Sequence, residues 1–354
     1  MKIKVSSPGK IHLIGEHAVV YGKSAVLAAI NKRCFVMLTP RKDKKIKIIS
    51  KQLKRSKFPS LAVSKALSYY KNPKASGFTL EINCEIPIGC GLGSSAAIAV
   101  SVAGAITLFL KKPFDKKIIN EIAFEIEKIQ HGNPSGGDNT ASCYGGLIAY
   151  RKSLTARRPR VESDARRSLV QSSKLVPSSL SESRRSEFKK NPNISMPTFS
   201  SLSSGPARVS LLNNFYIINS GTPKESTKIM VEHVAQLYKK NPEVVDKFLK
   251  DQEKLANTLI KSLKANKSSV AQIIKSAQGN LEKIGVVSAF AKKVIRAIEK
   301  AGGAAKICGG GGIKKGTGVL LVYHKNKKVI TEIAASFNLP YNEIRLGEEG
   351  LKIE

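Results

Sequence analysis

Several titratable side chains gather in one short segment near the start of the chain. These are Lys10, His12, Glu16 and His17, which follow the pair Pro8–Gly9. A cluster of ammonium, carboxylate and imidazole groups is typical of a polar binding or catalytic site. The two histidines lack the HExxH spacing with which one helix presents two zinc ligands, so we do not expect a zinc site.

A second segment combines glycines with hydroxyl side chains between a predicted strand at 78–86 and a predicted buried helix at 94–110. It consists of Pro87, Ile88, Gly89, Cys90, Gly91, Leu92, Gly93, Ser94, Ser95, Ala96 and Ala97. Glycines let backbone N–H groups approach a phosphate chain, and a helix N-terminus adds partial positive charge. A tight strand-to-helix connection needs fewer glycines, so the segment predicts a phosphate-binding turn.

Two carboxylates follow this turn in the sequence. Glu127 falls at the edge of the apolar stripe of a predicted helix at 116–130, where it either binds a cation such as Mg²⁺ or forms a salt bridge at the helix end. Asp138 lies in a polar loop at 131–139, where it either accepts a proton from a hydroxyl or caps the next element. We interpret His131 as a hydrogen-bonding residue that fixes this loop.

A glycine run near the end of the chain is the last motif. Gly309, Gly310, Gly311 and Gly312 lie between two short predicted strands, at 304–308 and 317–323. Consecutive glycines permit close approach of the backbone to a ligand or to another domain. A flexible linker is the alternative, although linkers rarely lie between apolar strands.

Both helices and strands must position these residues, so we expect a protein that contains both. At the N-terminus we expect a short strand at 3–6 followed by a glycine turn. In the second half, Thr222, Pro223 and Glu225 match an N-cap, a proline at the first helical position and a capping-box glutamate. Further helices are predicted at 60–70, 222–238, 242–264, 268–284, 288–301 and 328–337, and further strands at 215–218 and 343–346.

The length of 354 residues is enough for two domains. We expect an N-terminal domain at 1–150, a segment of different composition at 151–210 and a C-terminal domain at 211–354. The middle segment is rich in serine and arginine and poor in large apolar residues, which predicts a disordered or poorly packed insert. A basic arm for an acidic partner and a frameshift in the gene model remain alternatives.

The formal net charge of +34 would attract any polyanion: nucleic acid, an anionic membrane or a phosphorylated small molecule. A lysine-rich proteome would also explain it. Aromatic residues make up only 6% and tryptophan is absent, which argues against a nucleic-acid-binding surface. With no apolar leader or membrane span recognised, we expect a cytoplasmic protein that is not membrane-bound. Its cysteines should be reduced thiols: Cys34, Cys84, Cys90, Cys143 and Cys308.

Three of these motifs occur in an order that resembles the GHMP kinases, and within them the branch that phosphorylates mevalonate. The resemblance rests on Pro8–Gly22, on the turn at 87–97 and on the loop at 131–139. It implies a two-domain fold: an N-terminal α+β domain with a left-handed crossover, a ferredoxin-like C-terminal α+β domain, and a cleft between them for ATP and substrate.

The resemblance also implies roles for individual residues. The turn at 87–97 would bind the ATP phosphates, and Ser95 and Glu127 would hold Mg²⁺. Asp138 would take the proton from the primary hydroxyl of the substrate, while Lys10 would lower the pKa of that hydroxyl and stabilise the transferring phosphoryl group. Substrate binding would involve Glu16, His17, Ser226, Gly309, Gly310, Gly311 and Gly312.

Two departures from the family pattern stand out: Gly137 replaces a common valine, and Gly310 replaces a usual alanine. Both changes loosen the backbone locally. The expected partners are ATP and mevalonate, and the sequence leaves a homodimer open. The alternatives are a GHMP kinase for phosphomevalonate, homoserine or galactose, or an inactive kinase-like protein that binds a polyanion through its basic charge.

Overall fold

The computed structural model describes residues 2–50, 52–53, 56–72, 76–132, 134–152, 198–202, 212–265 and 270–354. Most of the predicted insert at 151–210 therefore lies outside the described residues. Its described ends belong to a sheet: β5 (Leu147–Arg151) pairs antiparallel with β6 (Thr198–Ser201).

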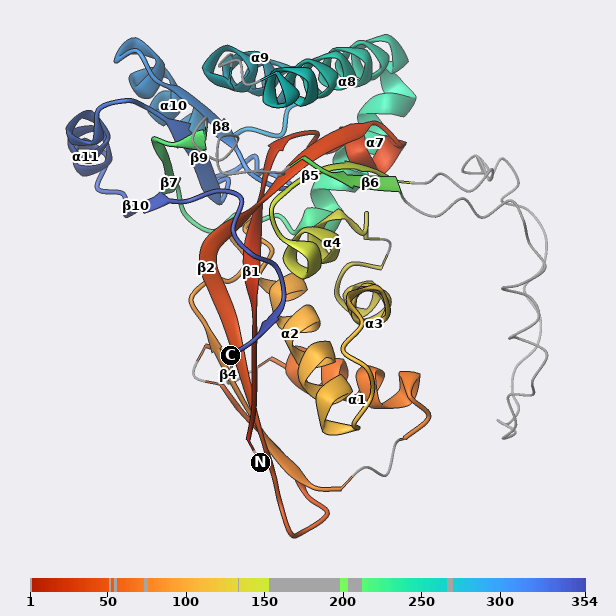
Figure 1. Cartoon of the computed structure of the whole chain (residues 1–354). Coiled ribbons are helices and arrows are strands. Elements are labelled where there is room, and N and C mark those ends of the chain that lie inside the picture. The colour runs from red at the N-terminus through yellow and green to blue at the C-terminus, as the bar shows by residue number, and fades with distance from the viewer. Residues whose placement is uncertain are drawn as a thin grey trace, which may run out of the picture.

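The first of two sheets occupies the N-terminal part of the molecule (Figure 1). Among the described residues it has seven strands in the order β11-β1-β2-β4-β3, with β5 paired to β2 and β6 to β5. The remaining strands are β1 (Ile3–Ile14), β2 (Ser24–Pro40), β3 (Ile46–Ser50), β4 (Phe78–Cys84) and β11 (Lys352–Ile353). The parallel strands β3 and β4 are connected through α1 (Phe58–Tyr69), and the other pairs are antiparallel.

Helices cover one face of this sheet (Figure 1). Besides α1 they are α2 (Ser94–Phe109), α3 (Lys116–His131) and α4 (Gly137–Tyr144). The alternation of β4 turns Phe78, Leu80 and Ile82 toward the core, and α2 is apolar on all sides because it is packed between β1, β2 and the other three helices. None of the described helices is long and apolar enough to cross a membrane.

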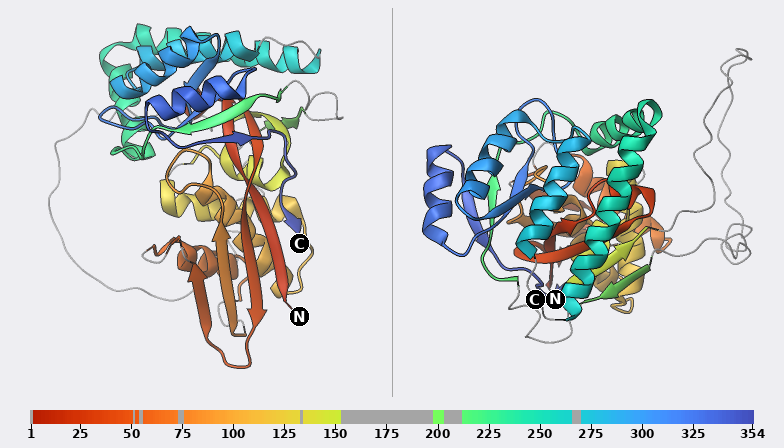
Figure 2. Two further views of the ribbon diagram at one scale, coloured as in Figure 1. Left: turned by 90° about the vertical axis from the view of Figure 1, so that its left-hand side faces the viewer. Right: turned by 90° about the horizontal axis from the view of Figure 1, so that it is seen from above.

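The C-terminal part is built on a second sheet with strand order β10-β7-β9-β8, in which all neighbours are antiparallel. Its strands are β7 (Phe215–Asn219), β8 (Ala304–Ile307), β9 (Val319–Tyr323) and β10 (Tyr341–Ile344). Its helices are α7 (Thr227–Lys240), α8 (Pro242–Lys264), α9 (Val270–Lys283), α10 (Ala289–Lys300) and α11 (Lys327–Ser336), which gather at one end of the molecule (Figure 2). This arrangement of helices and strands confirms the predicted ferredoxin-like α+β fold.

The N-terminal strand is longer than predicted. The expected turn after Ser6 does not form, because Pro8 and Gly9 lie inside β1, where the pairing with β2 shifts register between Pro8 and Lys10. A Cβ atom on Gly9 would lie 2.9 Å from the Leu92 carbonyl oxygen, so this glycine allows close packing rather than a chain reversal. Lys10 and His12 therefore project from one strand.

The first helix of the C-terminal part begins later than predicted. Ser226, not Thr222, is the N-cap of α7, and its Oγ accepts a hydrogen bond from the Ile229 N–H at 3.3 Å. Residues before it are held by the loop preceding β9, since the Gly318 N–H donates to the Gly221 carbonyl at 2.9 Å. The Glu225 carboxylate accepts from the Ile313 N–H at 3.4 Å, so it does not close a capping box.

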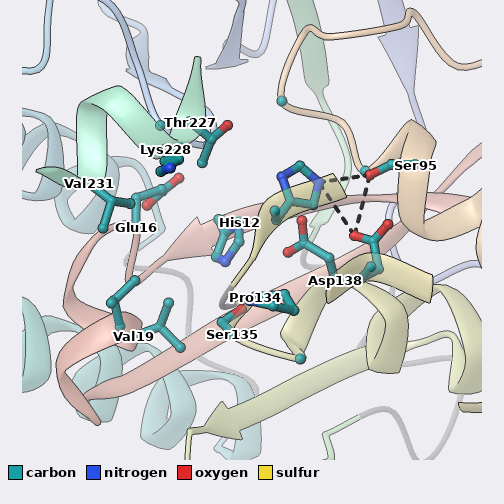
Figure 3. Close-up of a pocket in the computed structure, with 18 of the residues that line it drawn as sticks. His12, Glu16, Val19, Ser95, Pro134, Ser135, Asp138, Thr227, Lys228 and Val231 are labelled. Carbon is teal, nitrogen blue, oxygen red and sulfur yellow. Dashed lines mark hydrogen bonds and ion pairs between the residues drawn. The ribbon is translucent and has the colours of Figure 1, made fainter. Parts of the chain in front are cut away.

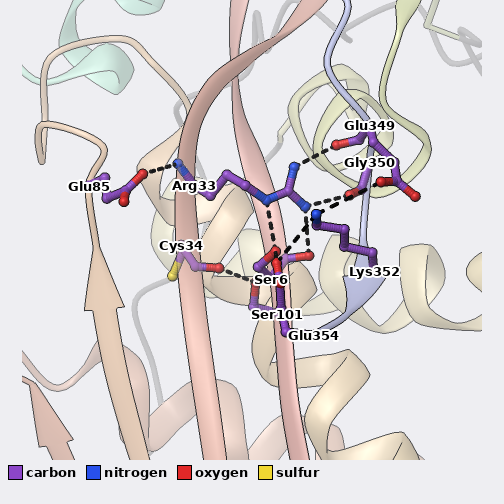
Figure 4. Close-up of polar contacts among 9 residues, drawn as sticks. All are labelled: Ser6, Arg33, Cys34, Glu85, Ser101, Glu349, Gly350, Lys352 and Glu354. Carbon is purple, nitrogen blue, oxygen red and sulfur yellow. Dashed lines mark hydrogen bonds and ion pairs between the residues drawn. The ribbon is translucent and has the colours of Figure 1, made fainter.

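The last residues of the chain return to the N-terminal sheet (Figure 4). The buried Arg33 guanidinium on β2 donates to Ser6 Oγ on β1 and to the carbonyls of Glu349 and Gly350, each at 2.7 Å. Ser6 Oγ in turn donates to the Glu354 carboxylate at 2.5 Å. Through these bonds and the β1–β11 pairing, the C-terminus forms one edge of the first sheet.

Candidate functional site

A cavity of about 550 Å³ is lined by residues from both parts of the molecule (Figure 3). It brings together the titratable cluster, the glycine turn, both carboxylates and part of the last glycine run. The lining residues are Lys10, His12, Glu16, His17, Val19, Val20, Gly89, Gly91, Gly93, Ser94, Ser95, Glu127, His131, Gly132, Pro134, Ser135, Gly136, Asp138, Asn139, Thr227, Lys228, Val231, Glu232, Gly309 and Gly310.

The centre of the cavity is an ion pair between Lys10 and Asp138. Lys10 Nζ lies 3.1 Å from Asp138 Oδ2, 3.2 Å from His12 Nδ1 and 3.2 Å from the Gly91 carbonyl. The lysine side chain is 2% exposed, whereas the aspartate side chain is 34% exposed. Burial tends to raise the pKa of Asp138, but the charge and hydrogen bond of Lys10, together with His12 and His131, outweigh it and hold that pKa below its usual value. Asp138 is thus an ionised acceptor open to the cavity.

The position of Asp138 also answers whether it is a cap. It lies in the first turn of α4, after Gly136, which is the N-cap residue. Its charge is therefore favourable at the positive end of the helix, while its side chain contacts Lys10 across the cavity. Asp138 is not the capping residue of α4.

The glycine turn fits closely against its neighbours. Gly91 and Gly93 have φ angles of +85° and +72°, a region that side chains rarely adopt. A Cβ atom on Gly93 would lie 2.8 Å from Lys10 Cγ, and one on Gly91 would lie 2.6 Å from the Cys308 carbonyl oxygen. Gly93 thus leaves room for Lys10, and Gly91 leaves room for the C-terminal part of the molecule.

Only part of the predicted turn faces the cavity. Gly89, Gly91, Gly93, Ser94 and Ser95 line it. Behind them Cys90, Leu92, Ala96 and Ala97 are buried in the core, and Pro87 and Ile88 are not among the lining residues.

All five cysteines lie in the described residues, are buried and form no disulfide.

Beside the turn, Ser95, Glu127 and His131 form a polar corner (Figure 3). Ser95 Oγ donates to Glu127 Oε2 at 3.3 Å and lies 3.2 Å from His131 Nε2. The Glu127 side chain is buried, and no described residue hydrogen-bonds to its Oε1. Burial, and then the charge of Asp138, raises the pKa of Glu127 to about 8. His131, the last residue of α3, shares a hydrogen bond with Ser95 in this corner.

The polar corner suits a hard cation that is shared with phosphate. The described residues contain no group of three or more histidines, cysteines or acids that could hold a metal by themselves. Mg²⁺ usually takes one or two carboxylates together with phosphate oxygens and water. A serine hydroxyl and a buried carboxylate with an unpartnered oxygen fit that ligand set.

On the other side of Lys10, Glu16 is paired with Lys306, a residue that sequence reasoning missed. Lys306 Nζ contacts Glu16 Oε1 and also donates to the carbonyls of His12 at 3.1 Å and Ile307 at 2.9 Å. Both side chains are almost fully enclosed, and no described residue bonds to Glu16 Oε2. Burial raises the pKa of Glu16, although Lys306 opposes the shift. The only sequence hint was a single lysine within an apolar strand.

The last glycine run is divided between two environments. His17 Nε2 lies 3.1 Å from the Gly310 carbonyl, and burial lowers the pKa of that histidine to about 4. Gly309 and Gly310 line the cavity. Gly311 and Gly312 face away from it, since added Cβ atoms would lie 2.1 Å from the Val286 oxygen and 2.6 Å from the Gly316 oxygen.

Ser226 does not line the cavity, because its side chain caps α7. The next residues, Thr227 and Lys228, reach the cavity instead, together with Val231 one turn later (Figure 3). His12 also lines it, although the sequence gave it no individual role. The common cause is an element boundary: a longer β1 and a later start of α7 change which side chains face inward.

Comparison with known proteins places these features in a family. Residues 60–146 match the model of the GHMP kinases N terminal domain. A mevalonate kinase of Archaeoglobus fulgidus is 32% identical over 320 residues, which cover 87% of this chain and 88% of that protein. A mevalonate kinase of Thermococcus onnurineus is 28% identical over 387 residues, covering 100% of this chain and 99% of the relative.

The fold agrees with the sequence comparison. The crystal structure of L. major mevalonate kinase in complex with R-mevalonate superimposes with a TM-score of 0.73 at 18% identity, covering 98% of this chain and 97% of that one. Both sheets are thus part of a known architecture, and the resemblance read from the motifs is confirmed. On the strength of a relative 32% identical over nearly the whole of both chains, this chain belongs to the GHMP kinase family and is an ATP-dependent kinase.

Proposed function

We propose that the protein transfers the γ-phosphoryl group of ATP to the 5-hydroxyl group of mevalonate. The observation that carries the proposal is the Lys10–Asp138 pair, at 3.1 Å, between the glycine turn and the side of the cavity that holds Glu16 and His17. The names of the relatives support mevalonate as the acceptor.

In this mechanism Asp138 is the general base. Its lowered pKa keeps it ionised at neutral pH, so it can accept the proton of the 5-hydroxyl as the oxygen attacks the γ-phosphorus. Lys10 is bound to the same carboxylate and donates toward the attacking oxygen and the transferring phosphoryl group. The bond from the γ-phosphorus to the bridging oxygen of ADP breaks, and the proton remains on Asp138 until release.

The glycine turn would hold the phosphates. Gly89, Gly91 and Gly93 expose backbone near the N-terminus of α2, whose partial positive charge favours anions. Ser95 and Glu127 would hold Mg²⁺ beside them. When bound, that ion neutralises phosphate charge and orients the γ-phosphoryl group. Its binding would require Glu127 to lose the proton that burial favours.

The opposite side of the cavity suits a short carbon chain with polar ends. Val19, Val20 and Val231 offer apolar contacts, and Lys228 offers a cation for a carboxylate. A small branched hydroxy acid matches this mixture, whereas a sugar would need more polar partners.

The test is ADP release with MgATP and, in parallel, mevalonate, phosphomevalonate, homoserine or galactose. Turnover with mevalonate at a kcat/KM at least about 100-fold above the others would support the proposal. If another of these acceptors is turned over instead, that acceptor and not mevalonate is the substrate. Folded protein that turns over none of them, and instead binds polyanions in a salt-dependent way, would favour the inactive alternative.

A further inference from the structure

His12 has one ring nitrogen that neither the fold nor the proposed chemistry uses. The residue lines the cavity and is 6% exposed. Its Nδ1 lies 3.2 Å from Lys10 Nζ. Its Nε2 is buried, and no described residue hydrogen-bonds to it. Because an unpartnered buried polar group is costly, this atom calls for a partner that the protein itself does not supply.

The contact with Lys10 determines what kind of partner fits. An ammonium group can only donate, so Nδ1 must accept the hydrogen bond and carry no proton. The proton of a neutral imidazole is then on Nε2, which makes this atom a donor. Burial and the neighbouring Lys10 charge lower the pKa of His12 to about 3, so the ring is neutral at physiological pH.

The location shows which ligand can reach this donor. Lys306 binds both the His12 carbonyl and the Glu16 carboxylate, and in Figure 3 the His12 ring is drawn between Glu16 and Asp138. Ser95, which hydrogen-bonds to Glu127 in the corner proposed for the cation and phosphates, is drawn on the other side of Asp138. His12 therefore faces the acceptor side. Lys10 and Asp138 already serve the reacting hydroxyl, so the Nε2–H remains for another oxygen.

We infer that the His12 Nε2–H donates a hydrogen bond to a second oxygen of the acceptor substrate, and so selects alcohols that carry such an oxygen near the reacting hydroxyl. This inference rests on the proposed function in taking mevalonate as the acceptor. In mevalonate the second oxygen is either the tertiary 3-hydroxyl or a carboxylate oxygen, and both accept hydrogen bonds. A site with a buried donor discriminates against analogues that leave it unpaired.

Two substitutions separate the donor from the Lys10 contact. In His12→Asn the short amide can still accept from Lys10, but nothing reaches the Nε2 position. In His12→Gln the longer amide can place an N–H near that position, while the Lys10 contact is lost. Both are tested with the full chain and MgATP, using mevalonate, its 3-deoxy analogue 5-hydroxy-3-methylpentanoate, and 3-methylpentane-1,3-diol, which lacks the carboxylate.

We expect the wild type to prefer mevalonate over at least one analogue by roughly 10-fold or more in kcat/KM. His12→Asn should lower kcat/KM for mevalonate about 10-fold and abolish that one preference, while KM for ATP changes less than about twofold. His12→Gln should retain the preference. The analogue whose discrimination disappears identifies the oxygen. Calorimetric titration of mevalonate, with no ATP present, should show the same order of affinities.

The inference is overturned if His12→Asn is folded and keeps the full preference against both analogues, or if both substitutions have equal effects. The wild-type measurements test the proposed function separately. If the wild type phosphorylates a different alcohol, the proposed substrate is wrong. The two variants are then compared on that alcohol, and an unchanged KM would reject the role of His12 as well.

Discussion

Two buried lysines, Lys10 and Lys306, each pair with a carboxylate on the cavity wall, yet their surroundings differ. Asp138, the partner of Lys10, is 34% exposed and lines the cavity. Glu16, the partner of Lys306, is 1% exposed, and its lysine also donates to two backbone carbonyls. The first pair joins two elements of the N-terminal part, whereas the second connects β8 to the segment after β1.

The same kind of ion pair can therefore serve two purposes. A carboxylate that is partly open to the cavity can leave its lysine and accept a proton from a bound ligand. A carboxylate enclosed with its lysine cannot do so without leaving a buried charge unpaired, which is strongly unfavourable. We therefore propose that the Lys10 pair takes part in the reaction and that the Lys306 pair holds the two parts of the molecule together. Four predictions, with their control variants, test this division, beginning with the largest expected effect.

Asp138→Asn should remove the proton acceptor and preserve the shape of the side chain. We expect kcat to fall about 10³-fold because general base catalysis contributes that much. KM for ATP and the midpoint of thermal unfolding should change little. Phosphoryl transfer in single-turnover experiments measures the effect. A kcat within about tenfold of wild type would remove Asp138 from the role of base.

Lys306→Met should act on stability instead. It leaves Glu16 buried without its cation, so the free energy of unfolding should fall by about 3–5 kcal/mol. Adding Glu16→Gln should recover much of this loss, because the remaining side chain is then uncharged.

The matched control is Lys10→Met. It should cost less stability, because water can reach the carboxylate of Asp138, but should abolish turnover. Urea unfolding of the three variants makes the comparison. Equal losses of stability for Lys10→Met and Lys306→Met would contradict the division between the two pairs.

Glu127 adds a third case, a buried carboxylate for which the described part of the chain offers no lysine ion pair. Its pKa is raised to about 8 in the folded protein from an ordinary value of 4.5. Without divalent cations, its contribution to the free energy of unfolding should be fully present below pH 4.5 and be lost as pH rises through about 8. The slope from this group is at most about 1.4 kcal/mol per pH unit.

Glu127→Gln has no such titration. Its stability relative to wild type should therefore increase between pH 5 and pH 8 in the presence of a chelator, as followed by urea unfolding at about unit pH steps. Mg²⁺ with nucleotide should reduce the difference, because metal binding favours the ionised wild-type carboxylate. A difference that does not vary with pH would show that Glu127 is ionised throughout.

Gly93→Ala tests whether the rate of the reaction depends on the exact position of Lys10. Gly93 and Gly89 share a φ of +72°, so alanine at either position brings similar backbone strain of about 1 kcal/mol. Only at Gly93 does the new methyl group meet Lys10, since nothing lies within 4 Å of a Cβ atom on Gly89.

Gly89→Ala is thus the matched control. We expect Gly93→Ala to lower kcat by about 10-fold more than Gly89→Ala, because catalytic geometry is sensitive to small displacements. Equal kinetic effects would mean that the lysine tolerates displacement.

Local sequence patterns selected Lys10, Glu127, Asp138 and the glycine turn, and the structure places these three side chains and part of the turn around one cavity. They could be selected because the proposed phosphate binding and proton transfer would need particular residue types at short spacing. Helix α8 was predicted with its observed bounds because its apolar periodicity and the proline at its first position both indicate a helix that starts there.

The missed features depend on tertiary contacts. Lys306 looks like any strand residue until Glu16 and the His12 carbonyl are brought to it from nearly the opposite end of the chain. The Pro8–Gly9 pair resembles a turn, but pairing with β2 keeps it in a strand. Thr222 is as good an N-cap by type as Ser226, but Ser226 is the N-cap of α7, and the Gly221 carbonyl just before Thr222 accepts a hydrogen bond from Gly318. These outcomes are decided by packing rather than by local preference.

The return of the C-terminus to the first sheet has a consequence for synthesis on the ribosome. Arg33 is made early, but the Gly350 carbonyl that it binds is 317 residues further along the chain. Until that segment emerges, the nascent N-terminal sheet lacks the edge strand β11 and leaves a buried guanidinium partly unpartnered. The sheet is therefore complete only after residues 349–353 have been made, and until then its edge is open to incorrect strand pairing.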